Sequence, residues 1–351
     1  MIRKYLNEMV KRGASDLHFT ANSKPIVRID DKLILIGEEV LGPDSVKTIA
    51  YSMLSDHQIK EFEENMELDF SFESQNLSRF RVNIYLQRGH IGCAIRRIPF
   101  EIMNFEECGL PAEIVTELCN KPKGLVLVTG ATGSGKSTTL ASMVNKINED
   151  RSCHIITVED PIEFVHKNKK AVIEQREVFK DTHSFSEALR HVLRQDPDVI
   201  LIGEMRDLET IKSALIIAET GHLVFATLHT SDAVQTINRI IDVFPSHQQA
   251  QARVQLSFVL LAVLAQQLIP RASGNGRVLA TEVLQVTPAV RSLIREQKIH
   301  QIYSSIQTGQ KEGMRTMNQA LYELCKKNLI TYDEAISRSI SPEEFSKLFK
   351  S

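Results

Sequence analysis

The sequence predicts an α/β protein, in which a core with a parallel sheet follows a small α+β domain and precedes a helical tail. Residues 130–137 match the phosphate-binding pattern G-x-x-x-x-G-K-[ST], between an apolar run and a stretch with helical spacing. From Gly124 onward, long apolar runs alternate with helical patterns. Such alternation favours parallel strands with helices on both faces of the sheet.

The elements of this core follow from the same patterns. Apolar runs of strand length predict strands over residues 125–129, 154–158, 198–202, 223–228 and 278–286. Helical spacing predicts helices at about 136–149, 185–194 and 208–220, and a helical pattern throughout from Pro288. The longest apolar run, Phe258–Ala265, is too short to span a bilayer, and we expect it to form a buried core helix.

The first hundred residues predict a separate, smaller domain. Helical spacing predicts helices from Ile2 to Val10 and at about 44–64, and strand-like segments lie near 17–20, 26–29, 33–36, 68–72, 79–86 and 91–98. Helix and strand breakers then cluster around 109–111 and 121–124. The predicted organisation is therefore a domain over 1–98, a linker or hinge over 99–122, a core over 123–287 and a helical region over 288–351.

Composition narrows the class of partner. The chain has 42 Lys and Arg against 44 Asp and Glu, so we expect no direct binding to nucleic acid and membrane contact only through a partner. The five cysteines form no C-x-x-C pair, which predicts neither a zinc site nor a disulfide framework. A reducing cytoplasm fits this cysteine usage.

The segment Gly130-Ala131-Thr132-Gly133-Ser134-Gly135-Lys136-Ser137-Thr138 predicts binding of a nucleoside triphosphate. Its glycines let successive N–H groups point inward, and the following helix directs its positive end to the same place. Lys136 would add a point charge on the terminal phosphates, and Ser137 would ligate Mg²⁺. The alternative is a glycine-rich turn without a ligand.

Two predicted strands end in carboxylates. Glu204 follows the strand that ends at Ile202, and in a parallel sheet that end faces the phosphate loop. There it could hold Mg²⁺ through water or orient the nucleophile; otherwise it is a turn former or a helix cap. Glu159, Asp160 and Glu163 follow another strand, and we predict that Glu163 aligns and deprotonates the attacking water unless these acids form only a solvated turn.

His222 and His229 bracket the strand predicted over 223–228, beside Thr227 and Thr230. They could sense the γ-phosphate by hydrogen bonding, although a histidine in such a place is commonly structural.

Arginines cluster in the first domain, at Arg79, Arg81, Arg88, Arg96 and Arg97. Period-2 spacing places Arg79 and Arg81 on one strand face. That face is either a solvated polar surface or a source of arginine fingers for a neighbouring subunit's nucleotide, and the sequence leaves both readings open.

These motifs occur together and in this order in the secretion ATPases of type II secretion and type IV pilus systems, which the chain resembles over essentially its whole length. Residues 193–198 and 203–207 resemble the Walker B signature of that family, 159–163 its Asp box, 221–230 its His box, and 15–19 and 79–83 its N-terminal domain.

Within that family the chain resembles the pilus-retraction branch. It is short, with one domain before the core, and it lacks the four-cysteine zinc element of assembly ATPases. The segment Ala289-Val290-Arg291-Ser292-Leu293-Ile294-Arg295-Glu296 resembles the retraction motif AIRNLIRE, with Val290 in place of Ile and Ser292 in place of Asn.

The resemblance implies a homohexameric ring in which each chain has a PAS-like first domain and a RecA-like core that hydrolyses ATP with Mg²⁺. It assigns the metal-associated role to Glu204, the catalytic carboxylate to Glu163, and arginines acting across the subunit interface to Arg81 and Arg96.

The implied function is type IV pilus retraction, exerted on an inner-membrane platform protein from the cytoplasmic face of that membrane. The alternatives are an assembly or secretion ATPase and a nucleotide-gated regulatory scaffold with little hydrolysis. A RecA-like nucleic-acid motor is a further alternative, which the nearly neutral charge disfavours.

Overall fold

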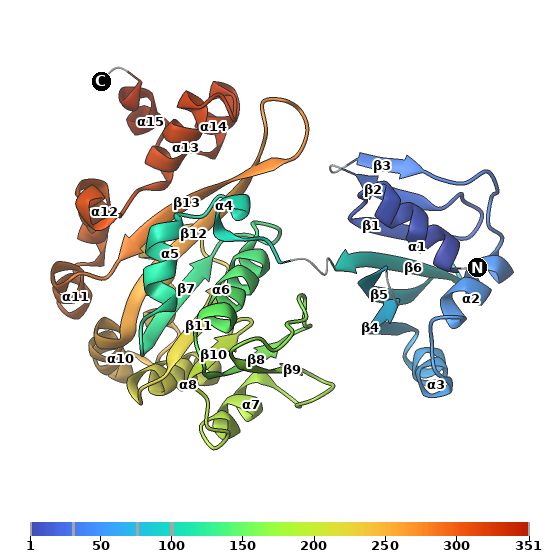
Figure 1. Ribbon diagram of the computed structural model, residues 1–351, viewed down its shortest axis with the longest axis horizontal. Coiled ribbons are helices and arrows are strands. Elements are labelled where there is room, and N and C mark those ends of the chain that lie inside the picture. Colours follow the sequence, from blue (N-terminus) through green and yellow to red (C-terminus); the bar gives the residue numbers. More distant parts are fainter. Residues whose placement is uncertain (1, 30–31, 75–76, 99–101, 350–351) are drawn as a thin grey trace. The chain divides into compact units, whose positions relative to one another are not determined.

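The computed structural model describes residues 2–29, 32–74, 77–98 and 102–349. The chain divides into two compact units, residues 1–101 and 102–351, each with its own sheet (Figure 1). Residues 99–101, where the predicted linker begins, lie outside the described residues.

The smaller unit is an antiparallel sheet with three helices. Its strands lie in the order β3 (Lys32–Leu35), β2 (Ile26–Ile29), β1 (Asp16–Phe19), β6 (His90–Ile98), β5 (Ser78–Gln87) and β4 (Glu67–Ser74). The helices are α1 (Ile2–Lys11), α2 (Pro43–Tyr51) and α3 (Asp56–Asn65). The single helix predicted at about 44–64 is thus two helices, because Ser55 starts α3 with a capping box that it forms with Gln58.

Side chains alternate across this sheet. Phe80, Val82 and Ile84 of β5 are buried in the core of the unit, whereas Arg79 and Arg81 lie on the opposite, partly exposed face. The period-2 prediction for the two arginines is therefore confirmed.

The larger unit contains a seven-stranded, mostly parallel sheet, so the predicted α/β class with a parallel sheet is confirmed. Its strands lie in the order β13 (Arg277–Gln285), β12 (Leu260–Pro270), β7 (Gly124–Thr129), β11 (Leu223–Leu228), β10 (Val199–Ile202), β8 (His154–Glu159) and β9 (Val172–Glu177). Every neighbouring pair is parallel except β12 with β13.

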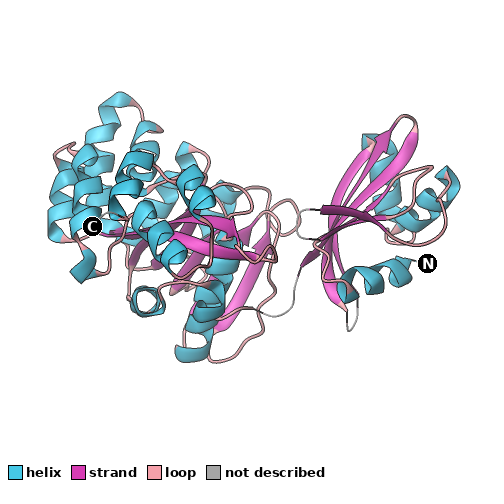
Figure 2. Cartoon of the chain, turned by 90° about the horizontal axis from the view of Figure 1, so that it is seen from above, coloured by secondary structure: helices cyan, strands magenta, loops and turns pink. Residues whose placement is uncertain are grey.

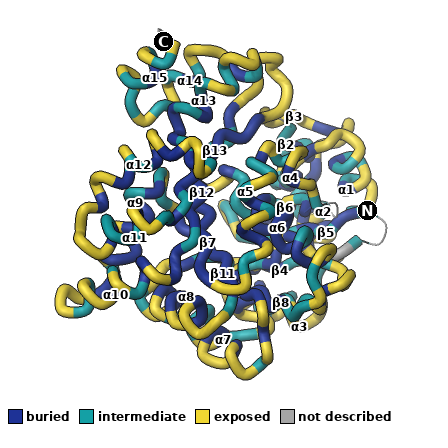
Figure 3. Tube along the Cα trace, turned by 60° about the vertical axis from the view of Figure 1, so that its left-hand side comes forward, coloured by how far each residue is buried: buried dark blue, intermediate teal, exposed yellow. Residues whose placement is uncertain are grey.

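Helices cover both faces of this sheet (Figure 2). One face packs on α4 (Phe105–Cys108), α5 (Ala112–Cys119) and α6 (Lys136–Asp150). The other packs on α7 (Phe185–Val192), α8 (Leu208–Glu219), α9 (Ala233–Asp242), α10 (Ser246–Val259), α11 (Pro288–Arg295) and α12 (Ile302–Thr308). Figure 3 shows that the central strands are buried along their length, which explains their nearly continuous apolar runs.

The last three helices pack together at the outer edge of the sheet. They are α13 (Met317–Lys326), α14 (Tyr332–Arg338) and α15 (Pro342–Leu348), and the short 3₁₀ turns Ile299–Gln301 and Gln310–Glu312 lie before them. Met317 and Phe345 bury against Ile269 and Val278 of the β12–β13 hairpin.

Two segments differ from the sequence prediction. The apolar run Phe258–Ala265 is not a helix: α10 ends at Val259 and β12 begins at Leu260, whose backbone is extended. A strand buried on both faces and a buried helix give the same apolar run, so periodicity could not separate them. Within the predicted linker, α4 and α5 instead belong to the larger unit, where Val115 and Leu118 are buried against its core.

In the part of the chain that the structure describes, no helix has the length and apolar character needed to cross a membrane.

Candidate nucleotide site

The carboxyl ends of four parallel strands meet at one edge of the larger sheet. Because β7, β11, β10 and β8 run in the same direction, the loops that follow them lie side by side. The phosphate loop follows β7, Glu204 follows β10, the acidic turn follows β8 and His229 follows β11. The topology thus places together most of the candidates that the sequence predicted.

The phosphate loop links β7 to α6 in the predicted strand–loop–helix order. Gly130 has a φ of 142°, and a Cβ there would lie 2.4 Å from the carbonyl oxygen of Gln266 and 2.5 Å from the Ser134 hydroxyl, so only glycine fits. The Ser134 hydroxyl is buried and has no hydrogen-bond partner among the described residues. A tight glycine cradle with an unsatisfied buried donor fits an oxygen-rich ligand such as a phosphate.

Lys136, the first residue of α6, folds back over this loop. Its ammonium group donates hydrogen bonds to the carbonyl oxygens of Gly130 at 2.8 Å and Ala131 at 3.0 Å. Burial lowers the pKa of Lys136, while the charges of Glu204 and Glu163 act to raise it. The two carboxylates follow different strands, but these strands are parallel to β7 and end at the same edge of the sheet as the phosphate loop.

Glu204 is held by two side chains, those of Arg206 and His229. One carboxylate oxygen lies 2.6 Å from the Arg206 guanidinium, and the other lies 3.2 Å from Nε2 of His229. Burial by itself would raise the pKa of Glu204, but Arg206 and His229 together hold it below its ordinary value. Glu204 is thus an ionised group, fixed between β10 and the loop after β11.

The turn that carries Glu163 is supported by polar groups that are at least partly buried. The Glu159 carboxylate accepts hydrogen bonds from the Thr157 hydroxyl at 2.6 Å and from the Gln175 amide at 3.2 Å, and also from the backbone N–H of Glu163. Burial raises the pKa of Glu159 to about 7. The Glu163 side chain itself is exposed at the edge of the turn, where a solvent molecule can reach it.

Three supporting residues were not singled out from the sequence. Gln175 and Glu177 lie on β9, which the sequence did not predict as a strand, and they accept hydrogen bonds from the backbone of His166 and Ile162 at 2.8 and 3.3 Å. Arg206, the partner of Glu204, lies only two residues beyond it. That spacing was visible in the sequence; the contribution of β9 was not, because its residues are largely polar.

The structure does not bring His222 into this site. His222 precedes β11, and its carbonyl accepts from the N–H of Gly124 at the start of β7. Seven residues along a strand separate it from His229, a rise of about 23 Å. Its Nδ1 lies 3.1 Å from the carbonyl oxygen of Ile217 near the end of α8. His222 therefore contacts the end of that helix in place of the predicted γ-phosphate contact.

Arg81 and Arg96 face each other across β5 and β6 of the smaller unit. Nε of Arg96 lies 2.8 Å from the Asp16 carboxylate, and Nε of Arg81 lies 3.9 Å from that of Asp69. Both side chains are more than 40% exposed, so each guanidinium retains donors that face solvent.

The retraction-motif segment forms α11. Val290 and Ile294 are buried in the core, whereas Nε of Arg291 is buried without a hydrogen-bond partner among the residues that the structure covers. Arg291 lines a cavity of about 790 Å³ together with residues of α5, including Glu113 and Glu117.

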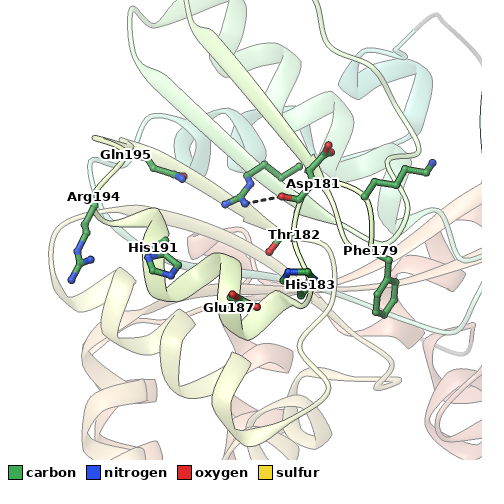
Figure 4. Close-up of a pocket in the computed structure, with 10 residues that line it drawn as sticks. Phe179, Asp181, Thr182, His183, Glu187, His191, Arg194 and Gln195 are labelled. Carbon is green, nitrogen blue, oxygen red and sulfur yellow. Dashed lines mark hydrogen bonds between the residues drawn. The ribbon is translucent and has the colours of Figure 1, made fainter.

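A second cavity, of about 540 Å³, lies beside the loop between β9 and α7 (Figure 4). The loop contributes Phe179, which is 79% exposed and has a left-handed φ of 68°. Arg176 donates to the carbonyl oxygen of Asp181 at 2.9 Å, and His191 lines the cavity from α7. Its lining shares no residue with the phosphate loop.

Comparison with known proteins gives the family. Residues 1–336 match the model of the Type II/IV secretion system protein family. The type IV pilus retraction ATPase PilT of Pseudomonas aeruginosa is 49% identical over 344 residues, which cover 98% of this chain and 99% of that protein. A twitching motility protein of Neisseria gonorrhoeae is 48% identical over 322 residues, covering 92% of this chain and 86% of that protein.

Among solved structures, the crystal structure of the pilus retraction motor PilT with bound ADP is similar to this chain. Its TM-score is 0.91 at 49% identity, and the match covers 98% of each chain. The likeness therefore extends over both units. Together with the family match, it identifies the chain as a member of the Type II/IV secretion system protein family.

Proposed function

We propose that this chain is an ATP-hydrolysing motor for type IV pilus retraction. The carrying observation is that an intact phosphate loop with Lys136, Glu204 and the turn with Glu163 all follow parallel strands at one edge of the sheet. The 49% identity to a retraction ATPase over nearly the whole chain supports retraction over assembly or secretion. In this proposal the larger unit is a RecA-like core, the smaller unit is PAS-like, and the helices from Pro288 onward form the C-terminal region.

The active form in this proposal is a homohexamer at the cytoplasmic face of the bacterial inner membrane. It acts on the membrane platform protein of the pilus and contacts the membrane only through such partners. ATP hydrolysis drives a conformational change of the chain, and residues 99–122 include the hinge. Sequential closure around the ring would then turn the platform and remove pilin subunits.

The proposed nucleotide is ATP with Mg²⁺. The described residues contain no group of three or more His, Cys, Asp or Glu side chains that could hold a metal on their own. Ser137 and the phosphate oxygens would therefore provide most of the ligands, and Glu204, already engaged by Arg206 and His229, would act through water. When bound, Mg²⁺ neutralises charge that develops on the phosphates.

The chain's own groups have separate roles in this reaction. Residues 130–138 bind the phosphates, and Lys136 would exchange its two carbonyl partners for phosphate oxygens. Glu163 accepts a proton from the attacking water. His229, which contacts Glu204, senses the γ-phosphate by hydrogen bonding. Arg81 and Arg96 of a neighbouring subunit would stabilise charge in the transition state.

The two histidines give opposite expected results. His229→Ala removes a partner of the Glu204 carboxylate, and we expect kcat for ATP hydrolysis to fall about tenfold, the value of one hydrogen bond to a charged group. His222→Ala serves as the control and should leave kcat within about twofold, because His222 lies at the other edge of the sheet. Equal losses in steady-state assays of the two variants would contradict this assignment.

Substitution of Arg291 should separate ATP hydrolysis from pilus retraction. Arg291→Ala should leave ATP hydrolysis within about twofold of the parent, because the side chain lines a cavity formed by α5 and the C-terminal region. Twitching motility in cells should be lost. Lys298→Ala, just beyond the motif and paired with Glu296 at 2.8 Å, should preserve both. Equal loss of hydrolysis and motility in Arg291→Ala would mean that the motif supports the fold.

Deletion of the gene in its host tests retraction directly. Loss of a retraction motor leaves many pili that do not retract, whereas loss of an assembly ATPase leaves none. Pilus counts and retraction events, observed by fluorescence microscopy, decide between these outcomes. Absence of pili in the deletion strain would reject the retraction proposal and favour assembly.

A further inference from the structure

One carboxylate outside the nucleotide site joins two helices of the larger unit. Glu282 lies on β13 and is 1% exposed. One of its carboxylate oxygens accepts from the backbone N–H of Ala233 at 2.9 Å, and the other accepts from that of Met317 at 3.2 Å. These are the first residues of α9 and α13, so a single buried side chain contacts the N-termini of both helices.

These two N–H groups have no other partner within their helices. At each helix start the capping side chain serves a later residue: Asp232 accepts from the N–H of Gln235, and Thr316 accepts from that of Gln319. Glu282 thus satisfies the donors that the caps leave over. Because both of its oxygens accept, the ionised carboxylate fits this position, and the two positive helix ends favour it.

Burial acts against that charge. It raises the pKa of Glu282 to about 7, and the N–H groups of Ala233 and Met317 oppose the rise. A buried acid is costly to keep in a core, and a strand position of this kind would be filled more cheaply by an apolar residue. The carboxylate is therefore best explained by the two helix starts that it holds together.

The first of these helices begins directly after the loop that carries His229. His229 lies 3.2 Å from the Glu204 carboxylate, and four residues later Ala233 starts α9. Between them, the Thr230 hydroxyl lies 2.6 Å from that of Thr236, which donates to the carbonyl of Asp232 at 2.7 Å. The loop is tied to the first turn of α9, so whatever holds that turn also holds His229.

The second helix is attached to β13 independently of Glu282. Arg315, two residues before α13, exchanges backbone hydrogen bonds of 3.1 and 2.9 Å with Val283. Asn318, on α13, contacts the backbone of Ile340 and Ser341, each at 3.1 Å, and so anchors the helix to the C-terminal segment. Glu282 therefore links the loop that carries His229 to a part of the unit that has its own anchors.

We propose that Glu282 is a positioning residue for the nucleotide site, holding α9 so that His229 stays against Glu204 and coupling that loop to α13. The inference rests on the proposed ATP hydrolysis. It gives the C-terminal helices a direct mechanical link to the His229 loop, through one side chain and two backbone N–H groups.

The test is a double-mutant cycle of ATP hydrolysis with Glu282→Gln and His229→Ala in the full-length chain. Glutamine keeps the shape but offers an NH₂ group where one N–H donor needs an acceptor. Alone, Glu282→Gln should lower kcat about tenfold with KM for ATP changed less than about twofold, as expected of a displaced loop. In the His229→Ala background it should cost less than about twofold further.

Losses that multiply in the double variant, or an unchanged kcat in Glu282→Gln, would overturn the proposal. Asn148→Ala is the matched control, since Asn148 is buried near the C-terminal end of α6 and its hydrogen bonds go to the backbone of Lys167 and Lys169; it should lower Tm and leave kcat within about twofold. If the parent chain does not hydrolyse ATP, the proposed function fails as well. If the parent hydrolyses ATP but the losses of kcat multiply in the double variant, only the role of Glu282 is rejected.

A second variant covers the case in which Glu282→Gln does not fold. Ala233→Pro removes the N–H that donates to Glu282 at a position where helices accept proline. It should lower kcat, again without further loss in the His229→Ala background, and should speed hydrogen exchange over residues 229–236. Ala233→Pro removes the donor of the contact, whereas Glu282→Gln alters its acceptor. If hydrogen exchange and kcat are both unchanged in Ala233→Pro, the proposal is overturned.

Discussion

Lys136→Ala is expected to reduce ATP hydrolysis by at least about 10²–10³-fold, the effect of removing one preorganised charge at a transition state. Lys136 is the one cation that the phosphate loop itself supplies, and its ammonium group already lies over the loop, on the carbonyl oxygens of Gly130 and Ala131. Without it, the loop offers only backbone dipoles to the phosphates. Phosphate release by the purified protein, combined with a titration of ATP binding, measures both effects.

Lys146→Ala is the matched control for this variant. Lys146 lies on the same helix, α6, and its ammonium group forms an exposed ion pair with Asp150 at 3.0 Å. Its loss should change hydrolysis by less than about twofold, because exposed pairs of this kind contribute little. Near-normal hydrolysis by Lys136→Ala would show that the loop is not the catalytic phosphate site.

Glu163→Gln is expected to bind ATP as the parent does but to hydrolyse it about 10²–10⁴-fold more slowly, the range for loss of a general base. The amide keeps the hydrogen bonds that shape the turn, because these come from the backbone N–H of Glu163 and from Glu159. Calorimetric titration with ATP and single-turnover hydrolysis separate binding from chemistry.

Glu174→Gln provides the control for that charge change. Glu174 lies on β9, where it pairs with Ile156, and is 59% exposed with a long 3.6 Å contact to His154. Its hydrolysis rate should match that of the parent. If Glu163→Gln turns over ATP at the parent rate, Glu163 is not the base, and Glu159, whose pKa burial raises to about 7, becomes the next candidate.

Local patterns predicted the parts of the fold that depend on neighbouring residues. The strand before the phosphate loop, the loop itself and α6 lie where the sequence places them, because glycine geometry and apolar spacing act over a few residues. Glu204 could also be placed near the loop, since the carboxyl ends of parallel strands share one edge.

The rest depends on long-range packing that no local pattern contains. The polar strand β9 is specified by its pairing with β8, and it supplies Gln175 and Glu177 to the turn that carries Glu163. The two histidines around β11 look equivalent in sequence, yet strand direction sends only His229 to the phosphate edge. Glu282 resembles any acid in a strand until α9 and α13 are seen to converge on it.

Steady-state release of phosphate from ATP and Mg²⁺ by the purified full-length parent chain tests the central claim most directly. The account predicts continuous turnover that stops when Mg²⁺ is chelated. Binding of ATP without phosphate release would contradict it and indicate a nucleotide-gated scaffold. Failure to bind ATP at all would remove the basis of every role assigned to residues 130–138.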